Sequence, residues 1–479
     1  MRRVAAAVLI GFLLLLINVN VVQVVQAGSL KKDPHNGRVL IQQFARPRGP
    51  IVVGGTTIAR SRKTNDALKY QRIYPAGARY AAVTGFFSFV YGTAALERTE
   101  NALLSGTDDR LAFKRLSDLI TGREPQGGAV VLTLDPAAQA AAVDGLGGRP
   151  GAVVALDPRS GAILAMATAP SYDPNPLSTH NGKSLTAAYQ KLNSDPDSPL
   201  LNRATSETYP PGSLFKVVTA AAALSSGRYS PDSRIPAPRS LDLPQTTKNL
   251  TNFGGESCGD GSTDTLAHAL QISCNTAFGG LGLALAAEPI ATRARAFGFG
   301  VSTRVPLTVV PSVFPSGLDA PQTAQSAIGQ FSVRVTPTQA AMIAAAVANR
   351  GSLMKPYLIK EVRAPDLSTL EVAKPQQLSS ATTPEVADQL TAMMQRVVDR
   401  GTARAAQIPG VAVAGKTGTA QHANGEPPHA WFIGFAPADS PRVAVAVLVE
   451  NGGGAGSEAT GGAIAAPIAR AVMSAVLGQ

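Results

Sequence analysis

Two residues in the middle of the chain have the types and spacing of a serine nucleophile with its own base. Ser213 and Lys216 stand three positions apart in the stretch TYPPGSLFKVV. Two prolines and a glycine precede the serine and an apolar run follows it, which is typical of a turn leading into a helix. On a helix, positions i and i+3 share a face, so the lysine amine can reach the serine hydroxyl. The same pattern also fits a plain helix capped by serine.

The S-x-x-K pattern is weak by itself, because it occurs three times in this chain, as Ser29–Lys32, Ser213–Lys216 and Ser352–Lys355. Only Ser213 lies where a turn is expected to enter a helix. The apolar neighbours of Lys216 favour a lowered pKa for its amine, as a general base requires. The sequence therefore selects Ser213 as the candidate nucleophile.

Two further short motifs follow in the chain, and each occurs once. Ser273-Cys274-Asn275 is an S-x-N motif, and Lys416-Thr417-Gly418 is a K-T-G motif within a strand expected over 409–420. In isolation Ser273 and Asn275 would be ordinary loop or cap residues, and Lys416 would be a solubilising charge on an edge strand. The order S-x-x-K, S-x-N, K-T-G is the signature of serine β-lactamases and penicillin-binding proteins.

With these motifs in their contexts, the chain resembles the class B penicillin-binding proteins, and among them the short A type. The resemblance covers nearly the full length. The stretches that carry it are YPPGSLFK, SCNTAF, AGKTGTAQ, AWFIGFAP, GAVVALDPRSGAILAMATAPSYDPN and AIGQFSVRVTPTQAA. It implies a peptidoglycan D,D-transpeptidase that β-lactams acylate, with a role in cell wall synthesis, cell shape and cell division.

The resemblance also implies roles for individual residues. Ser213 would attack the carbonyl between two terminal D-alanines of a stem peptide and form an acyl-enzyme, while Lys216 takes the serine proton. Ser273 would pass a proton toward the leaving nitrogen. Asn275 would hydrogen-bond the substrate backbone and Lys216.

The K-T-G strand would bind the substrate. Lys416 would supply positive charge near the substrate carboxylate, and the hydroxyls of Thr417 and Thr419 would bind that carboxylate, with Gly418 between them. The backbone N–H groups of Ser213 and Thr419 would form the oxyanion hole.

Cys258 and Cys274 are the only cysteines of the chain. In an oxidising compartment such a pair is a candidate disulfide, and two buried thiols are the alternative. Because Cys274 lies between Ser273 and Asn275, a bridge would support the active-site loop without any redox chemistry. Trp431, the only tryptophan, is expected in the core.

The periodicity around these motifs predicts an α+β domain with one antiparallel sheet between helical layers. A hairpin is expected over 151–170, helices over 214–226, 264–286, 336–351 and 463–477, and strands over 409–420, 429–436 and 442–450. The resemblance names this fold as the penicillin-binding/serine β-lactamase-like transpeptidase domain.

The rest of the chain predicts an anchor and a smaller domain. Residues 1–27 begin MRR and continue into an apolar stretch, which favours an uncleaved membrane anchor with the body on the extracytoplasmic side. The alternative is a signal peptide, for which Val25-Gln26-Ala27 is a weak cleavage site. Residues 28–150 are expected to form a pedestal or dimerisation-type domain with β-like stretches at 46–59 and 74–92, a helix at 93–106 and a strand leading into a helix at 130–143. Residues 151–479 form the expected transpeptidase domain.

The composition bears mainly on which partners are expected. The formal net charge is +11, yet the basic residues are dispersed, which favours anionic wall polymers and the membrane over nucleic acid. The histidines show no metal-ligand spacing, and no metal or cofactor is expected. The resemblance suggests a multispan glycosyltransferase as partner, because residues 28–150 are too short for a polymerising domain.

Three rival functions share this pattern. A β-lactamase would need a base for deacylation, and no E-x-x-L-N signature is present. A membrane β-lactam sensor usually has several membrane spans. A scaffold that does no chemistry would not need intact motifs.

Overall fold

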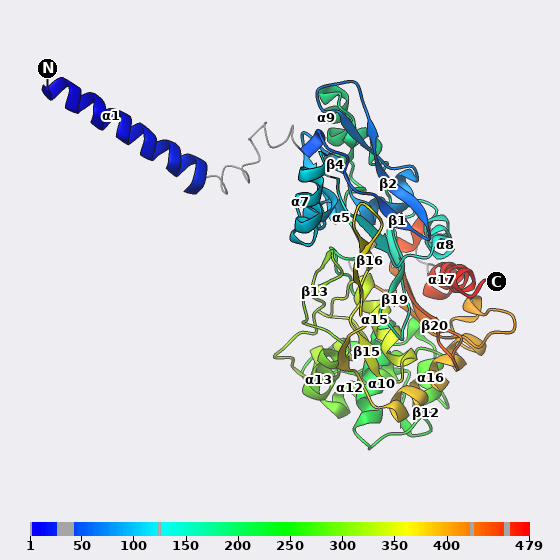
Figure 1. Ribbon diagram of the computed structural model, residues 1–479. Helices are drawn as coiled ribbons and strands as arrows, with labels where there is room; N and C mark the ends of the chain where they lie inside the picture. The colour runs from blue at the N-terminus through cyan, green and yellow to red at the C-terminus, as the bar shows by residue number, and fades with distance from the viewer. Residues whose placement is uncertain (1, 26–42, 123, 125, 422–425, 455–459) are drawn as a thin grey trace.

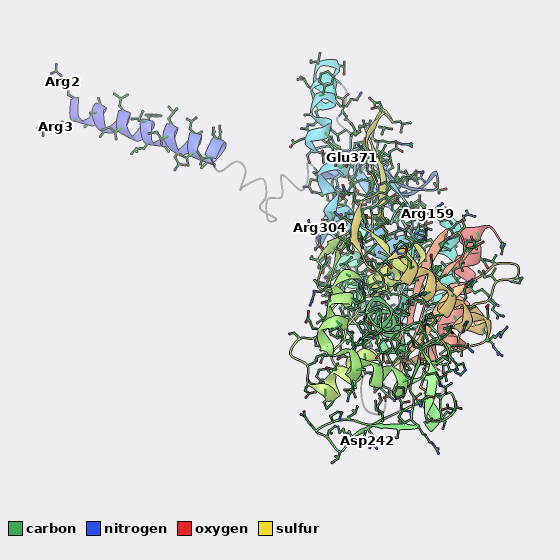
Figure 2. All side chains as sticks on the ribbon, turned by 90° about the horizontal axis from the view of Figure 1, so that it is seen from below. Arg2, Arg3, Arg159, Asp242, Arg304 and Glu371 are labelled. Carbon is green, nitrogen blue, oxygen red and sulfur yellow. A yellow bond between two sulfur atoms is a disulfide. The ribbon has the colours of Figure 1, made fainter. Side chains whose placement is uncertain are left out.

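The computed structural model describes residues 2–25, 43–122, 124, 126–421, 426–454 and 460–479. The Ser29–Lys32 pair, the end of the expected anchor and residues 28–42 of the expected pedestal lie outside these ranges. The chain begins with an isolated apolar helix, α1 (Arg2–Asn20), which continues as one π-helical turn to Val25. Its mean hydropathy is 2.5 and none of it is buried, so by length and composition it can cross a membrane. Arg2 and Arg3 protrude from its first turn (Figure 2).

A five-stranded antiparallel sheet forms the centre of the larger part of the molecule, in the order β19-β20-β21-β7-β8. Its strands are β7 (Gly151–Leu156), β8 (Ile163–Ala169), β19 (Ala414–Ala420), β20 (His429–Ala436) and β21 (Val443–Val449). Every residue of β7, β20 and β21 is buried, because helices cover both faces of the sheet. The hairpin and the late strands predicted from the sequence are therefore confirmed, although β19 begins five residues after the expected start.

Two groups of helices form the layers on either side of this sheet (Figure 1). One group consists of α8 (Pro136–Leu146) and α17 (Gly461–Leu477), which pack on each other. The other contains α10 (Lys216–Ser225), α12 (Asn275–Leu285), α13 (Ala287–Ala296), α15 (Pro337–Ala348) and α16 (Pro384–Asp399). α15 is buried along its whole length against β20, β21 and β7. The predicted fold class, helices on both faces of an antiparallel sheet, is confirmed.

The single helix predicted over 264–286 is wrong. The structure has α11 (Leu266–Gln271), a break, and then α12. Ser273 lies in the break with φ of +65°, a left-handed conformation that a continuous right-handed helix cannot contain. Periodicity alone missed the break because the residues on both sides are apolar.

The smaller part of the molecule is built on a mixed six-stranded sheet in the order β17-β16-β6-β1-β2-β3. Four strands come from the expected pedestal: β1 (Ile51–Val53), β2 (Thr56–Lys63), β3 (Tyr70–Ile73) and β6 (Ala129–Leu132). The remaining two, β16 (Ile359–Arg363) and β17 (Thr369–Val372), come from far along the chain. β16 pairs directly with β6, so the two parts share one sheet.

The longest regular segment within the β-like stretch expected at 74–92 is helical, so that part of the prediction is wrong. The stretch forms a 3₁₀ turn (Gly77–Tyr80) and α4 (Ala81–Thr84), with only the short strands β4 (Phe87–Ser88) and β5 (Gly92–Thr93). The alanines of this stretch favour helix. The helix expected at 93–106 is present as two short pieces, α5 (Ala95–Thr99) and α6 (Asn101–Leu104), followed by α7 (Ala112–Thr121).

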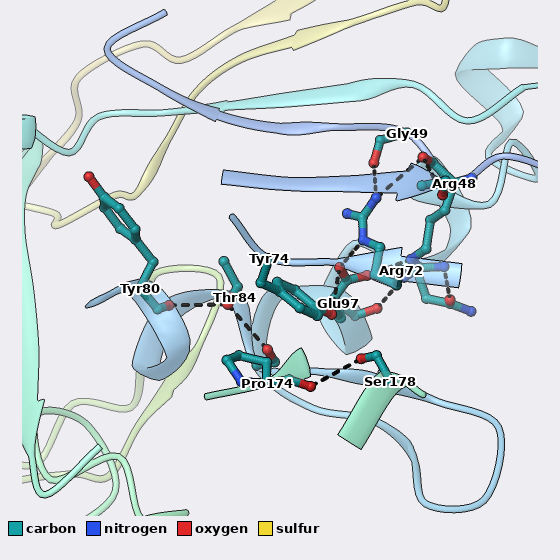
Figure 3. Close-up of polar contacts among 12 residues, drawn as sticks. Arg48, Gly49, Arg72, Tyr74, Tyr80, Thr84, Glu97, Pro174 and Ser178 are labelled. Atoms are coloured by element: carbon teal, nitrogen blue, oxygen red, sulfur yellow. Dashed lines mark hydrogen bonds and ion pairs between the residues drawn. The ribbon is translucent and has the colours of Figure 1, made fainter. Parts of the chain in front are cut away.

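A buried charged cluster lies between the six-stranded sheet and α5 (Figure 3). Glu97, which is fully buried, accepts hydrogen bonds from Arg48 Nε at 2.5 Å and Arg72 Nε at 2.6 Å. Burial acts to raise the pKa of Glu97, but the two guanidinium groups outweigh it and the pKa is lowered. The Tyr74 hydroxyl donates to the same carboxylate at 3.2 Å.

Candidate active site

The nucleophile candidate lies on a tight turn at the head of a buried helix. Ser213 belongs to a 3₁₀ turn, Gly212–Phe215, which runs directly into α10. The residues in the capping positions of these two helices are Pro211 and Phe215, and neither makes a side-chain cap hydrogen bond. The serine therefore does not act as the helix cap that its position in the sequence also allowed.

Two glycines let the K-T-G strand approach this turn. Gly212 has φ of +54°, and a Cβ at this position would lie 2.7 Å from the carbonyl oxygen of Thr419. Across the gap, a Cβ on Gly418 would lie 2.9 Å from the carbonyl oxygen of Pro211. Any larger residue at either position would push β19 away from Ser213.

Lys216 is fully buried below this turn and contacts the S-x-N loop through three hydrogen bonds. Its Nζ donates to the carbonyl oxygen of Ser273 at 2.6 Å, to Asn275 Oδ1 at 2.8 Å and to Ser273 Oγ at 3.3 Å. Burial, and after it the positive charge of Lys416, lowers the pKa of Lys216 well below its ordinary value. A lysine amine with a lowered pKa is neutral more often near pH 7 and can accept a proton.

Lys416 approaches the same loop from the opposite side. It is fully buried on β19, and its Nζ donates to Ser273 Oγ at 2.9 Å and to the carbonyl oxygen of Thr417 at 2.9 Å. Burial lowers the pKa of Lys416 to about 7. The hydroxyl of Ser273 thus lies between two lysine amines, which suits a group that passes a proton.

The two cysteines form a disulfide, with their Cα atoms 6.2 Å apart. The bridge ties Cys274, in the middle of the S-x-N motif, to a segment that follows β11 (Asn249–Thr251). Trp431 is fully buried and donates a hydrogen bond to the carbonyl oxygen of Pro210 at 3.1 Å, so its prediction as a core residue is confirmed.

These residues surround one cleft of about 1110 Å³. Ser213, Ser273, Asn275, Thr417 and Thr419 line it, and Lys216 and Lys416 lie directly behind Ser273. The structure therefore brings together residues that are more than 200 positions apart in the sequence.

Two residues of the site escaped the sequence reasoning. The hydroxyl of Thr402 lies 2.6 Å from that of Thr417, and Asn252 accepts a hydrogen bond from the backbone of the S-x-N loop; both residues line the cleft. Neither belongs to a recognisable motif. Only their place in the folded chain identifies them.

Comparison with known proteins agrees with this geometry. The family model for the penicillin-binding protein transpeptidase domain matches residues 151–474. The model for the penicillin-binding protein A dimerisation domain matches residues 48–130.

Curated relatives match over the whole chain. The peptidoglycan D,D-transpeptidase PbpA of Mycolicibacterium smegmatis is 48% identical, over 100% of this chain and 98% of its own length. The PbpA protein of Mycobacterium tuberculosis H37Rv is 46% identical over the same shares. The crystal structure of PBPA from M. tuberculosis superposes with a TM-score of 0.86 at 45% identity, covering 90% of this chain and all of its own. Its ceftriaxone acyl-enzyme complex gives a TM-score of 0.89, covering 91% and 100%.

Proposed function

The chain belongs to the penicillin-binding protein transpeptidase family and is a peptidoglycan D,D-transpeptidase that works through a serine acyl-enzyme, and we propose that Ser213 is the acylated serine. The observation that carries this proposal is the convergence of the three motifs on one cleft, with two buried lysines on either side of the Ser273 hydroxyl. The acyl-enzyme structures of the M. tuberculosis relative support it. The reaction would serve cell wall synthesis, including cell shape and division.

In the proposed acylation, Ser213 Oγ attacks the carbonyl carbon between the two terminal D-alanines while neutral Lys216 takes the hydroxyl proton. The C–N bond then breaks, and Ser273 passes a proton to the leaving D-alanine nitrogen. The amine of a second stem peptide attacks the ester carbonyl, releases Ser213 and completes the cross-link. The hydrogen bonds of Lys216 to the S-x-N loop support this assignment, because they hold the base one helical turn from the nucleophile.

The K-T-G strand would hold the substrate during this reaction. Lys416 attracts the terminal carboxylate, and the hydroxyls of Thr417 and Thr419 bind it at the cleft wall. The backbone N–H groups of Ser213 and Thr419 would form the oxyanion hole, where one lost donor costs about 10²–10³ in rate. The close approach of Gly212 to Thr419 supports this pairing.

Labelling with a fluorescent penicillin tests the proposal. The full chain in detergent is expected to form a stable adduct, and Ser213→Ala is expected to form none while keeping the wild-type melting temperature. Rapid turnover of the drug would instead indicate a β-lactamase. No adduct on the wild-type protein would indicate a scaffold without chemistry.

We also propose the domain division 1–27, 28–150 and 151–479. The start of the matched transpeptidase domain at residue 151 supports the second boundary. One hairpin crosses this boundary: β16 and β17 lie after residue 150 in the sequence, but β16 pairs with β6 of the pedestal sheet.

The apolar helix α1 fits a single-pass membrane protein, and we propose that the catalytic part lies on the extracytoplasmic side. Arg2 and Arg3 at the start of α1 favour a cytoplasmic N-terminus. The disulfide supports an oxidising compartment for the body. A C-terminal alkaline phosphatase fusion is expected to be active, and an inactive fusion would contradict the orientation.

For the partner, we propose that the pedestal docks on a multispan glycosyltransferase through the exposed face of α7. Phe113, Leu116 and Ile120 recur at i, i+3 and i+7 and are 86%, 55% and 78% exposed. α7 belongs to the part of the chain that follows the anchor in the sequence, and its exposed apolar side chains are therefore the candidate contact with a membrane-embedded partner.

Replacing these three side chains of α7 with serine is expected to abolish co-purification with the polymerase and to leave penicillin labelling intact. The matched control is Val313→Ser, an exposed apolar side chain of the transpeptidase part. Equal recovery of the polymerase with both variants would exclude α7 as the docking surface.

A further inference from the structure

Asn252 is a nearly buried amide beside the S-x-N loop, in the segment that follows β11, and it is one of the residues that line the cleft. It is 9% exposed, although it belongs to none of the three motifs. Its Oδ1 accepts the backbone N–H groups of Asn275 at 2.8 Å and Thr276 at 3.0 Å. Its Nδ2 donates to the carbonyl oxygen of Glu256 at 3.0 Å and to Thr276 Oγ1 at 3.3 Å. Both ends of the amide are therefore engaged.

These contacts complete the start of α12. The first N–H groups of a helix lack partners within the helix, and a side chain at the N-cap position usually accepts one of them. Here the N-cap residue is Cys274, which makes no side-chain cap hydrogen bond and whose sulfur is held in the disulfide. Asn252, from a distant part of the chain, supplies the missing acceptor to two of these groups.

The same segment also fixes the side chain of Asn275. Asn275 Nδ2 donates to the carbonyl oxygen of Thr251 at 3.1 Å, which leaves its Oδ1 pointing at Lys216 Nζ, 2.8 Å away. Residues 251 and 252 therefore hold both the backbone and the side chain of Asn275. All three hydrogen bonds of Lys216 end on residues 273 and 275, so the position of this loop sets the position of the lysine amine.

The left-handed backbone of Ser273 makes this support necessary. A non-glycine residue with φ of +65° is strained, and such a conformation persists only where the surroundings hold it. The disulfide holds Cys274, the residue that follows Ser273. Asn252 holds the next two residues, Asn275 and Thr276.

We propose that Asn252 is a positioning residue for acylation, which fixes the start of α12 so that Asn275 and Ser273 hold Lys216 against Ser213. This inference rests on the proposed function, because it concerns the rate of that same acylation step. The side-chain amide of Asn252 uses its hydrogen bonds on Glu256, Asn275 and Thr276, so it acts on the reaction through Asn275.

Stopped-flow acylation by a chromogenic β-lactam tests this role, since it separates the acylation rate constant, the affinity of the noncovalent complex and the fraction of active enzyme. In Asn252→Ala the rate constant is expected to fall about 10- to 100-fold, because the two N–H groups of α12 lose their acceptor. The affinity is expected to fall less than the rate constant, because Lys416, Thr417 and Thr419 still bind the carboxylate and, of the assigned substrate-binding residues, only Asn275 is held by Asn252. Asn252→Asp keeps the oxygen acceptor for the two N–H groups but loses the donor to the carbonyl oxygen of Glu256, so it is expected to recover part of the rate.

Gln139→Ala is the matched control. Gln139 is also a buried amide that bridges backbone groups, since it accepts from the N–H of Met166 at 2.9 Å and donates to the carbonyl oxygens of Met166 and Arg79. It lies on α8, which packs on α17 and β8 and not on the group of helices that contains α10 and α12. We expect Gln139→Ala to destabilise the protein without moving the site. It should therefore lower the fraction of active enzyme and leave the acylation rate constant unchanged.

Two results would overturn the inference. One is a wild-type acylation rate constant in Asn252→Ala. The other is an equal loss in Asn252→Asp and Asn252→Ala, which would show that the oxygen acceptor is not what matters. Absence of acylation in the wild-type protein would instead refute the proposed function, so the two failures are distinguishable.

Discussion

Lys216 and Lys416 lower the stability of the folded protein, although the proposed reaction depends on both. Both are fully buried, and burial lowers the pKa of each. In the unfolded chain a lysine titrates near pH 10.4. The unfolded state therefore binds the proton more tightly than the folded state, and each lysine lowers the free energy of unfolding at neutral pH.

Lys416→Met tests this cost at the residue scale. The pKa of Lys416 is lowered to about 7, so its cost is full below about pH 7 and decreases as pH rises toward that of a free lysine. We expect the variant to gain about 1–2 kcal/mol of unfolding free energy at pH 7, net of two lost hydrogen bonds, and less at pH 9.5. Its acylation by a carboxylate-bearing penicillin should fall about 10- to 100-fold. Thermal melts at both pH values and labelling rates measure these effects.

A variant that melts below the wild-type protein at pH 7 would contradict this expectation. It would mean that the hydrogen bonds of Lys416 to Ser273 Oγ and to the carbonyl oxygen of Thr417 outweigh the cost of burying the amine.

At the scale of the elements, the S-x-N loop between α11 and α12 is held in place in two independent ways. One is covalent, the Cys258–Cys274 disulfide with a sequence separation of 16. The other is the set of hydrogen bonds from Asn252 and Lys216. The disulfide stabilises the folded protein by restricting the unfolded chain. The hydrogen bonds determine how the side chains of the loop are oriented.

Replacing both cysteines with alanine separates the effect of the disulfide from that of the hydrogen bonds. We expect a loss of about 3 kcal/mol in the free energy of unfolding, from the loop entropy that the bridge removes. The acylation rate constant should stay within about fivefold, because Asn252 and Lys216 still hold the loop. Denaturant unfolding and stopped-flow acylation are the measurements.

The control is the wild-type protein reduced by dithiothreitol, which should behave as the double variant does. A fall of the acylation rate constant by 100-fold with a full active fraction would mean that the disulfide, and not the hydrogen bonds, sets the geometry of the loop.

At the scale of the whole molecule, the shared sheet joins the pedestal to the transpeptidase part. β16 pairs with β6, and the side chain of Asn175 exchanges two hydrogen bonds with the backbone of Tyr74, at 2.9 and 3.0 Å. The hydroxyl of that same tyrosine reaches Glu97. Disrupting the charged cluster around Glu97 should therefore lower the stability of both parts.

Glu97→Gln keeps the shape of the side chain and removes its charge. Because Arg48 and Arg72 would then be buried without a counter-ion, we expect a loss of about 3–5 kcal/mol in unfolding free energy at pH 7. The pKa of Glu97 is lowered in the folded protein, so its contribution is fully present above about pH 4.3 and is lost as pH falls through the folded value. The difference between variant and wild type should shrink accordingly in calorimetry at low pH.

Glu371→Gln is the matched control, because its carboxylate also pairs with an arginine, Arg110, but is 59% exposed. It should change the unfolding free energy by less than about 1 kcal/mol. Two separate calorimetric transitions, with only one of them shifted by Glu97→Gln, would contradict the coupling of the two parts.

The sequence by itself determined the fold class, the late strands and the motif residues. The strands at the end of the chain are continuous apolar runs that must be buried on both faces, which left few alternatives to a sheet between helical layers. Ser213, Lys216, Ser273, Asn275 and Lys416 were found because their spacing follows from the local geometry of a helix turn, a loop and a strand. The Cys258–Cys274 pair could be suggested because no other cysteine competes.

Only the tertiary structure decided what holds these residues in place. The helix break at Ser273, the exchange of β16 into the pedestal sheet and the helical turns at 77–84 all depend on contacts between distant segments, which local periodicity does not record. Asn252 and Thr402 belong to no motif, because their roles come from a position in space next to Asn275 and Thr417. The burial of both lysines was decided in the same way. Their lowered pKa values follow from the low-polarity surroundings that only the folded chain creates.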